Sequence, residues 1–132
     1  MKVIDKLAWI EIQDKKVLGT RSKGKDTFYI PGGKRESGES DEAALLREIK
    51  EELDVQLDQN SLQFMGTFRA QAHGHPDGVM VQMQCYTGDY SGQLKASAEI
   101  ETIEWLDTDD MNRISHVDKI IFRWLNERGL ID

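Results

Sequence analysis

Three glutamates on one face of a predicted helix are the residues of this chain best placed to do chemistry. Apolar spacing predicts a helix over residues 41–53, and Glu48, Glu51 and Glu52 project to the same side of it. Helix neighbours of like charge repel by about 0.2–0.5 kcal/mol per pair, so this grouping is unfavourable unless a cation binds there. Mg²⁺ takes oxygen ligands and is held by one or two carboxylates together with substrate phosphates. The grouping therefore predicts a site for Mg²⁺, with Mn²⁺ as a substitute.

Residues around the helix entrance complete the predicted site. The segment Pro31-Gly32-Gly33 predicts a tight turn with a bare backbone, so that a carbonyl such as that of Gly33 can face the metal. Arg47 lies one turn before Glu51, where an ion pair would orient that carboxylate. Glu39 at the helix entrance would accept from the same guanidinium. Arg47 is thus expected to hold the carboxylates in place.

A basic cluster precedes the helix and is suited to contacting phosphate oxygens. It surrounds a single acid, Asp26, and contains Arg21, Lys23, Lys25, Lys34 and Arg35. Because guanidinium and ammonium groups bind phosphate, we expect Arg21, Lys23, Lys34 and Arg35 to bind substrate. Phe28 and Tyr29 lie in the same stretch, and alternation along a strand would place one ring in the cleft, stacked on a base, and the other in the core. The sequence does not decide which ring faces the cleft.

The spacing of these residues resembles the signature box of the Nudix hydrolases. That box runs Gly, five residues, Glu, seven residues, Arg-Glu, an aliphatic residue, any residue, Glu-Glu, any residue, Gly and an aliphatic residue. The matching positions, in order, are Gly33, Glu39, Arg47, Glu48, Ile49, Glu51, Glu52 and Val55. Average residue usage makes such a match by chance on the order of 10⁻⁸ per window. The box glycine after the double glutamate is Asp54 here. We expect a left-handed helix end at this residue, at a cost of about 1 kcal/mol, with its carboxylate directed away from the metal ligands.

The resemblance implies an α/β fold (α+β), a sandwich of helices on both faces of a mixed central sheet. It also implies Mg²⁺-dependent hydrolysis of a nucleoside diphosphate linked to another moiety. Under it, Glu48, Glu51 and Glu52 would be metal ligands or the general base. In Nudix relatives a loop glutamate near Glu99 often joins the metal site or serves as base. Surface charge explains Glu99 and Glu101 equally well, and Glu99 is the preferred candidate of the two.

Residues outside the box narrow the implied substrate by elimination. The chain has no proline between Val55 and His75 and no tyrosine between Val55 and Cys85, so the marks of ADP-ribose hydrolases and dinucleoside polyphosphate hydrolases are absent. This leaves a MutT-like nucleoside triphosphate pyrophosphohydrolase that releases a monophosphate and pyrophosphate. The alternatives are an ADP-ribose or nucleotide-sugar pyrophosphatase, a non-catalytic Nudix-fold nucleotide sensor, and a structural interaction protein without metal affinity.

Composition limits the other function classes. The chain has 132 residues, of which 39% are hydrophobic, so we expect a single domain over residues 1–132. Residues 36–58 carry nine acids and two bases, so the charge of this segment equals the net charge of the whole chain, −7. An acidic net charge argues against binding of nucleic-acid polymers. No apolar run approaches the roughly 20 residues of a membrane span, and we expect a cytoplasmic protein with a small-molecule nucleotide as partner. A homodimer is compatible with the sequence.

The remaining elements follow from alternation and turn chemistry. We expect a strand over 2–12 that forms a hairpin with 17–21, a short strand over 27–30, a second hairpin of 62–72 and 79–88, a strand over 100–106, and a helix that Ser115 caps and Gly129 ends. His73 and His75 lie in the turn of the second hairpin, where loop polarity explains them better than metal binding, although they could touch substrate. Cys85, the only cysteine, is expected in the core.

Overall fold

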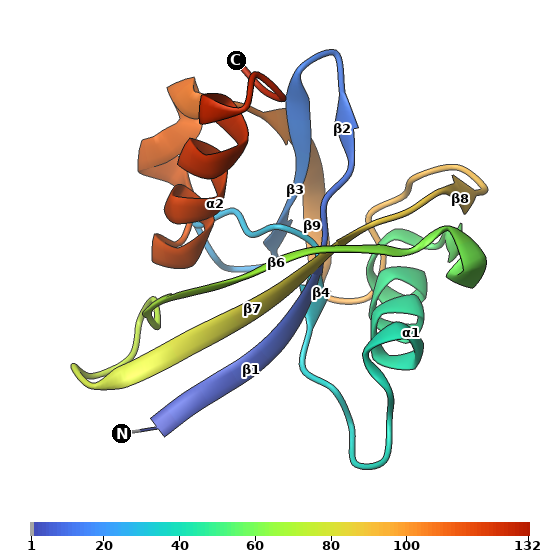
Figure 1. Ribbon diagram of the computed structural model, residues 1–132, viewed down its shortest axis with the longest axis horizontal. Helices are drawn as coiled ribbons and strands as arrows, with labels where there is room; N and C mark the ends of the chain where they lie inside the picture. Colours follow the sequence, from blue (N-terminus) through green and yellow to red (C-terminus); the bar gives the residue numbers. More distant parts are fainter. Residues whose placement is uncertain (1) are drawn as a thin grey trace.

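The computed structural model describes residues 2–132, and in it two α-helices lie on opposite sides of a mixed sheet (Figure 1). The strands are β1 (Lys2–Trp9), β2 (Ile12–Gln13), β3 (Lys16–Ser22), β4 (Gly32–Gly33), β5 (Gln56–Leu57), β6 (Gln63–Gln71), β7 (Val79–Thr87), β8 (Tyr90–Ser91) and β9 (Ile100–Leu106). The helices are α1 (Asp41–Leu53) and α2 (His116–Glu127), with short 3₁₀ turns η1 (Gln59–Ser61) and η2 (Thr108–Arg113).

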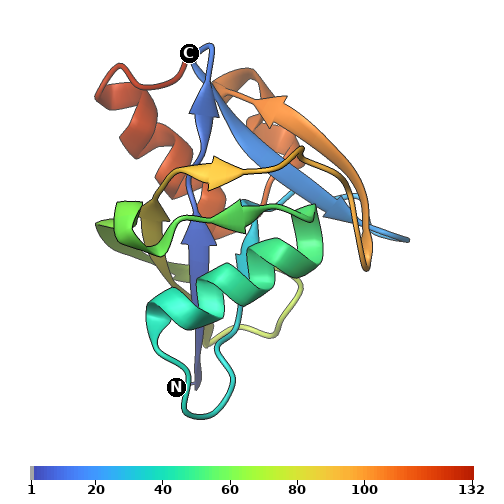
Figure 2. The same cartoon turned by 90° about the vertical axis from the view of Figure 1, so that its right-hand side faces the viewer.

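Strand β1 is the centre of the fold. The main sheet has the order β4-β1-β7-β6, in which β1 runs parallel to β7 while the β1–β4 and β6–β7 pairs are antiparallel. A second sheet has the order β2-β3-β9, and β5 pairs with β8. Turning the molecule by 90° places α1 in front of β1 and α2 behind it (Figure 2). The predicted mixed sheet and the second hairpin, β6–β7, are therefore confirmed.

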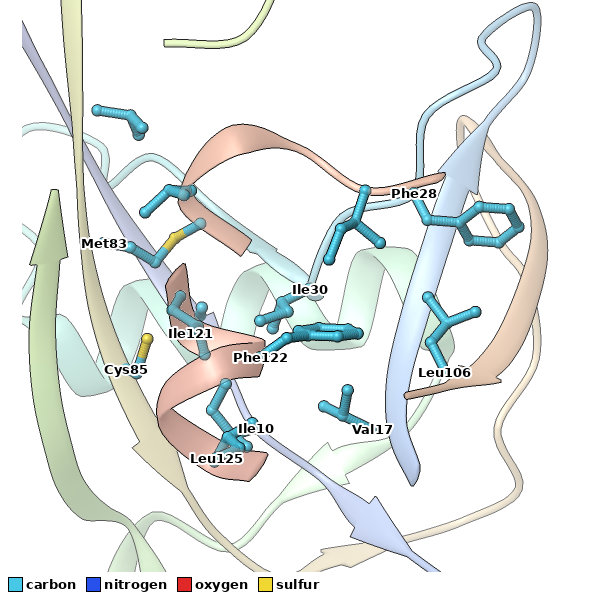
Figure 3. Close-up of a cluster of buried hydrophobic side chains, with 14 of the residues drawn as sticks. Ile10, Val17, Phe28, Ile30, Met83, Cys85, Leu106, Ile121, Phe122 and Leu125 are labelled. Carbon is cyan, nitrogen blue, oxygen red and sulfur yellow. The ribbon is translucent and has the colours of Figure 1, made fainter. Parts of the chain in front are cut away.

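Two hydrophobic clusters fill the space between the sheet and the helices. Leu7 and Trp9 of β1 pack toward α1, whereas Ala8 and Ile10 belong to the cluster that α2 covers. Figure 3 shows the α2 cluster, in which Phe122 lies among apolar side chains of the strands and of the loop before β4. Cys85 is fully buried in this cluster, as expected. Because both faces of β1 are covered, its second half is buried at consecutive residues and lacks alternation.

The predicted strand over 2–12 is wrong in its extent. The chain leaves the main sheet after Trp9, and only Ile12 and Gln13 form the hairpin with β3, opposite Val17 and Lys16. Strand β3 finds its long partner in β9, which lies far away in sequence. The chain passes from one sheet to the other at this point, and the four consecutive residues 7–10 are buried there.

The segment before the helix also differs from expectation. Residues 27–30 form two isolated bridges, Thr20 with Tyr29 and Phe28 with Ile114, and no extended strand. Pairing moves to Gly32 and Gly33, which form β4 against Ala8 and Leu7 of β1. The predicted turn at these glycines is thus a short strand whose backbone packs closely on β1.

Gly32 allows this close approach. Its φ is +148°, and a Cβ atom there would overlap the carbonyl oxygen of Leu7. We expect Gly32→Ala to lower the free energy of unfolding by at least about 3 kcal/mol, because a backbone clash has no flexible atom to relieve it. Urea denaturation followed by circular dichroism measures the loss. Gly38→Ala is the matched control for positive φ, since open space surrounds Gly38. Equal effects of the two changes would contradict the proposed clash.

Candidate functional site

Helix α1 begins and ends as the sequence predicts. Ser40 is the N-cap, and its Oγ accepts from the amide of Ala43 at 3.1 Å. Asp54 adopts the left-handed conformation at φ 55°, and its amide donates to the carbonyl of Lys50. The Asp54 carboxylate accepts from Lys50 Nζ at 3.1 Å. The departure from the box glycine therefore leaves the acidic face of the helix unchanged.

Arg47 connects the helix entrance with the acidic face. Its Nε and Nη2 donate to the two carboxylate oxygens of Glu39 at 2.8 Å each, and its Nη1 donates to Glu48 Oε1 at 2.8 Å. Nη2 also donates to the carbonyl of Lys34 at 3.1 Å. The expected pair with Glu51 is only a distant ion pair at 3.6 Å. Arg47 thus orients Glu39 and Glu48 more closely than Glu51, and with its help the pKa of Glu39 falls to about 2.

Glu52 is the buried carboxylate of the group. It is 8% exposed, and its Oε1 accepts from the amide of Gly32 at 3.3 Å. The pKa of Glu52 is raised to about 8, mainly by burial and also by the neighbouring charges of Glu48 and Glu99, against the effect of the Gly32 amide. Burial also raises the pKa of Glu48, to which Glu51 and Glu99 contribute. These carboxyl groups therefore lie near enough to repel one another when charged.

The donor set has the oxygen chemistry that a hard divalent cation takes, although its carboxylates are not gathered around one point in the described residues. Gly33 leaves room for Glu48, since a Cβ atom on Gly33 would be 2.5 Å from Glu48 Oε2. Within residues 2–132, no three side chains of His, Cys, Asp or Glu are gathered tightly enough to hold a metal ion. Glu48 is held by Arg47, Glu52 by the Gly32 amide, and the Glu51 side chain is 54% exposed. Carboxylate oxygens that repel one another beside a bare backbone are what such a cation would stabilise.

The loop before β9 brings Glu99 to this group. The amides of Lys95 and Ser97 donate to the carbonyls of Leu53 and Glu52 at 3.0 and 2.9 Å, which attaches the loop to the last turn of α1. Glu99 contributes to the raised pKa values of Glu48 and Glu52, so its charge faces theirs. Its neighbour Glu101 pairs instead with Arg21 at 2.8 Å. Glu99 therefore stays the preferred candidate of the two, as a prediction.

Two adjoining cavities extend from the glutamates across β1. The first, of about 180 Å³, is lined by Lys6, Leu7, Thr20, Ser22, Tyr29, Ile30, Gly32, Gly33, Glu52, Met83 and Ile100. The second, of about 110 Å³, shares Lys6, Tyr29 and Met83 with it and reaches His73, His75 and Ser115. Sequence reasoning missed Lys6. The sequence signal that could have revealed it is a charged residue on the inward face of a strand, because Lys6 lies between the buried residues Ile4 and Ala8 of β1.

Comparison with known proteins identifies the family. The chain matches the model of the NUDIX domain over residues 7–125. It belongs to the Nudix family. Curated relatives of the Nudix domain include an uncharacterized Nudix hydrolase, YvcI, of Bacillus subtilis, which is 28% identical over 101 residues, or 76% of this chain and 64% of that protein. An ADP-ribose pyrophosphatase of Methanocaldococcus jannaschii is 31% identical over 121 residues, or 86% of this chain and 70% of that protein. The chain therefore spans under two thirds of the length of YvcI.

Solved structures, a MutT Nudix hydrolase among them, share the fold. The E. coli ORF135 protein superposes with a TM-score of 0.74 at 23% identity, covering 97% of this chain and 92% of that chain. A MutT Nudix hydrolase from Burkholderia pseudomallei has a TM-score of 0.73 at 19% identity, covering 93% and 98%. The predicted α+β Nudix fold is thus confirmed. Neither helix in residues 2–132 is long and apolar enough to cross a membrane.

The basic residues before the Nudix box are only partly free to bind phosphate. Arg35 pairs with Asp5 at 2.6 Å and with Asp41, so the structure does not leave it facing the cleft. Arg21 donates to the carbonyl of Lys25 at 2.9 Å and pairs with Glu101. Lys23 and Lys34 have exposed side chains. Nearby acids thus compete with substrate for both arginines, whereas the two lysines keep their predicted role as an open proposal.

The structure also separates the two aromatic rings. Phe28 is 3% exposed and packs in the α2 cluster, with the Arg113 guanidinium 4.8 Å from its ring centroid. Phe28 is therefore the ring of the pair that packs in the core, and it is not a candidate for contact with substrate. Tyr29 lines both cavities and is the ring that faces the cleft. His73 and His75 line the second cavity, and His73 Nε2 lies 3.3 Å from Thr27 Oγ1.

Asp118 fixes the segment before the Nudix box from the side of α2. The fully buried carboxylate accepts from Ser115 Oγ at 2.7 Å and from the amide of Ile30 at 3.2 Å. Ser115 is at the predicted N-cap position, but its hydroxyl donates to Asp118 and makes no capping hydrogen bond to the helix backbone. Burial raises the pKa of Asp118 to about 6.

This burial predicts a pH-dependent cost in stability. In an unfolded chain the Asp118 carboxyl titrates near pH 4, about two units below its pKa in the folded protein. The folded state thus binds more protons between these values, and the free energy of unfolding falls as the pH rises from about 4 to about 6, by about 3 kcal/mol in total. Denaturation of the wild type and of Asp118→Asn across this range measures the difference. A constant gap between the two proteins would contradict the prediction.

Proposed function

We propose that the chain is a Mg²⁺-dependent hydrolase of nucleoside diphosphates linked to another moiety, and that its substrates are nucleoside triphosphates cleaved in the MutT manner to a monophosphate and pyrophosphate. The observation that carries the proposal is the carboxylate group at the end of the first cavity. Glu52 is buried beside Gly32, and Arg47 orients Glu48 toward Gly33. The elimination of two substrate classes from the sequence supports the triphosphate.

The residues of the Nudix box have separate tasks in this proposal. Glu48, Glu51, Glu52 and Glu99, with the carbonyl of Gly33, would hold the metal, which when bound neutralises phosphate charge and activates water. Arg47 keeps Glu39 and Glu48 in place through its bonds to both. The first cavity would take the phosphates, and the exposed side chains of Lys23 and Lys34 would bind them. Tyr29 would contact the nucleoside.

ADP-ribose hydrolysis is the second candidate. It is favoured by the relative from Methanocaldococcus jannaschii, which is an ADP-ribose pyrophosphatase at 31% identity. The two candidates differ in their products. Nucleoside triphosphates would give pyrophosphate, whereas ADP-ribose would give AMP and ribose 5-phosphate.

A substrate panel tests the proposal. The four common nucleoside triphosphates, ADP-ribose and a nucleotide sugar are incubated with the protein and Mg²⁺, and the products are separated by anion-exchange chromatography. We expect a monophosphate and pyrophosphate from at least one triphosphate, and loss of the reaction in EDTA. Turnover of ADP-ribose alone would favour the second candidate. Binding without any turnover would establish a nucleotide sensor and overturn the enzyme proposal.

A further inference from the structure

Lys6 is a charged side chain that the fold itself does not explain. It points inward from β1 between the buried residues Ile4 and Ala8, and it is partly buried. Among residues 2–132 it makes neither a hydrogen bond nor an ion pair, and its Nζ lies 5.6 Å from the centroid of the Tyr29 ring. An ammonium group withdrawn from water without an acceptor costs free energy. A ligand that supplies an acceptor would remove that cost.

The second cavity, of about 110 Å³, has aromatic, apolar and polar side chains in its lining that could contact a nucleobase. Its walls combine the Tyr29 and His73 rings with apolar side chains, namely Ile4, Ala72, Val81, Met83 and Val117. Apolar and aromatic side chains beside a few convergent polar groups are typical of ligand pockets. Lys6 lies at the junction with the first cavity. A nucleotide with its phosphates beside Glu52 would therefore extend its base past Lys6.

Charge argues against a phosphate group at this junction. Burial lowers the pKa of Lys6, and the charge of the buried Asp118 carboxyl, whose Oδ1 has no hydrogen-bond partner among the described residues, opposes that shift. Glu52 and Glu48 stabilise the ammonium in the same way from the other side. An anion would meet this acidic surrounding, whereas an uncharged acceptor oxygen would meet only the donor.

We propose that Lys6 is a specificity-determining residue that donates a hydrogen bond to the O6 keto oxygen of guanine or the O4 keto oxygen of uracil or thymine. The inference rests on the proposed nucleotide substrate and deepens it, since it favours guanine and uracil or thymine nucleotides over adenine and cytosine nucleotides. An ammonium group carries three donors and no acceptor. Guanine and uracil present a carbonyl where adenine and cytosine present an amine, so the latter bring a donor against a donor.

Metal-free binding tests this role without relying on turnover. Isothermal titration calorimetry in EDTA compares GMP with AMP and UMP with CMP. We expect the keto member of each pair to bind at least about tenfold tighter, and Lys6→Met to abolish that difference. Lys6→Gln, which offers both a donor and an acceptor, should bind both members similarly. Lys2→Met removes an exposed lysine of the same strand and should leave the preference intact.

Several outcomes would overturn the inference. They are equal affinities in the wild type, a preference that survives Lys6→Met, and no binding of any nucleotide at millimolar concentration. A uniform loss of affinity for all four nucleotides in Lys6→Met would also overturn it, because Lys6 would then bind phosphate. Thermal melting of both Lys6 variants checks their folding, and two variants guard against failure of one. If the protein prefers keto bases but hydrolyses nothing, the proposed enzyme is refuted and this inference stands. If it hydrolyses nucleotides without that preference, the proposed enzyme stands and this inference is refuted.

Discussion

Glu52→Gln is expected to lower kcat for Mg²⁺-dependent hydrolysis by about 10³-fold while the protein remains folded. Glutamine has nearly the same volume as glutamate, and its Oε1 can still accept from the Gly32 amide that Glu52 binds at 3.3 Å. What the change removes is the ionisable carboxyl group at the buried end of the first cavity, which would carry a negative charge when a cation is bound. If this charge holds a cation, nothing else at that position replaces it. Initial rates at saturating substrate, with near-unchanged melting behaviour, measure the effect.

The control tests whether the loss of activity is specific to Glu52 or follows from the removal of any glutamate charge. Glu127→Gln alters an exposed glutamate at the end of α2, outside the residues that line either cavity, and should leave kcat unchanged. Titration with Mn²⁺ provides a second measurement, since Glu52→Gln should weaken metal binding and Glu127→Gln should not. Near-normal turnover in Glu52→Gln would remove Glu52 from the metal site.

The helix and its acidic face could be predicted because they depend on short-range spacing. Ser40, the run of helix formers and the left-handed Asp54 are set by neighbours in sequence, and all appear as expected. Carboxylates three and four residues apart necessarily share a face. The same spacing does not fix rotamers, so the structure alone shows that Arg47 binds Glu39 and Glu48 closely and Glu51 only at 3.6 Å.

The fate of the basic residues could not be predicted, because their partners are distant in sequence. Arg35 is held by Asp5, which is 30 residues earlier, and by Asp41. Asp41 also accepts from the hydroxyl of Tyr86, 45 residues later, at 2.8 Å. A local count of charges suggests a phosphate site, whereas the folded chain uses Arg35 to join β1 to the start of α1.

The cleft is the other part that sequence reasoning could not assemble. Lys6, Tyr29 and Met83 line it together because Lys6 lies opposite Met83 in the β1–β7 pairing and Tyr29 is bridged to Thr20 of β3. Such pairing is non-local and has no counterpart in local periodicity. The same reason explains why the single strand predicted over 2–12 divides between two sheets.

Arg47→Lys is expected to lower kcat/KM by about 10²-fold although the positive charge is kept. The guanidinium reaches both oxygens of Glu39, Glu48 Oε1 and the carbonyl of Lys34 at once, at 2.8 to 3.1 Å. A lysine ammonium is a compact charge that cannot reproduce this planar set of bonds. We therefore expect Glu48 to lose its fixed position beside Gly33, with a misplacement large enough to slow the reaction.

The matched control is Arg123→Lys, an exposed arginine of α2, which should have no effect on hydrolysis. Kinetics at several Mg²⁺ concentrations distinguish the two ways in which Arg47→Lys could act. If Arg47 only balances charge, lysine should restore full activity, and the positioning role would be refuted. If it positions Glu39 and Glu48, excess Mg²⁺ should recover only part of the loss, because saturating the site with metal does not restore the direction of the two carboxylates.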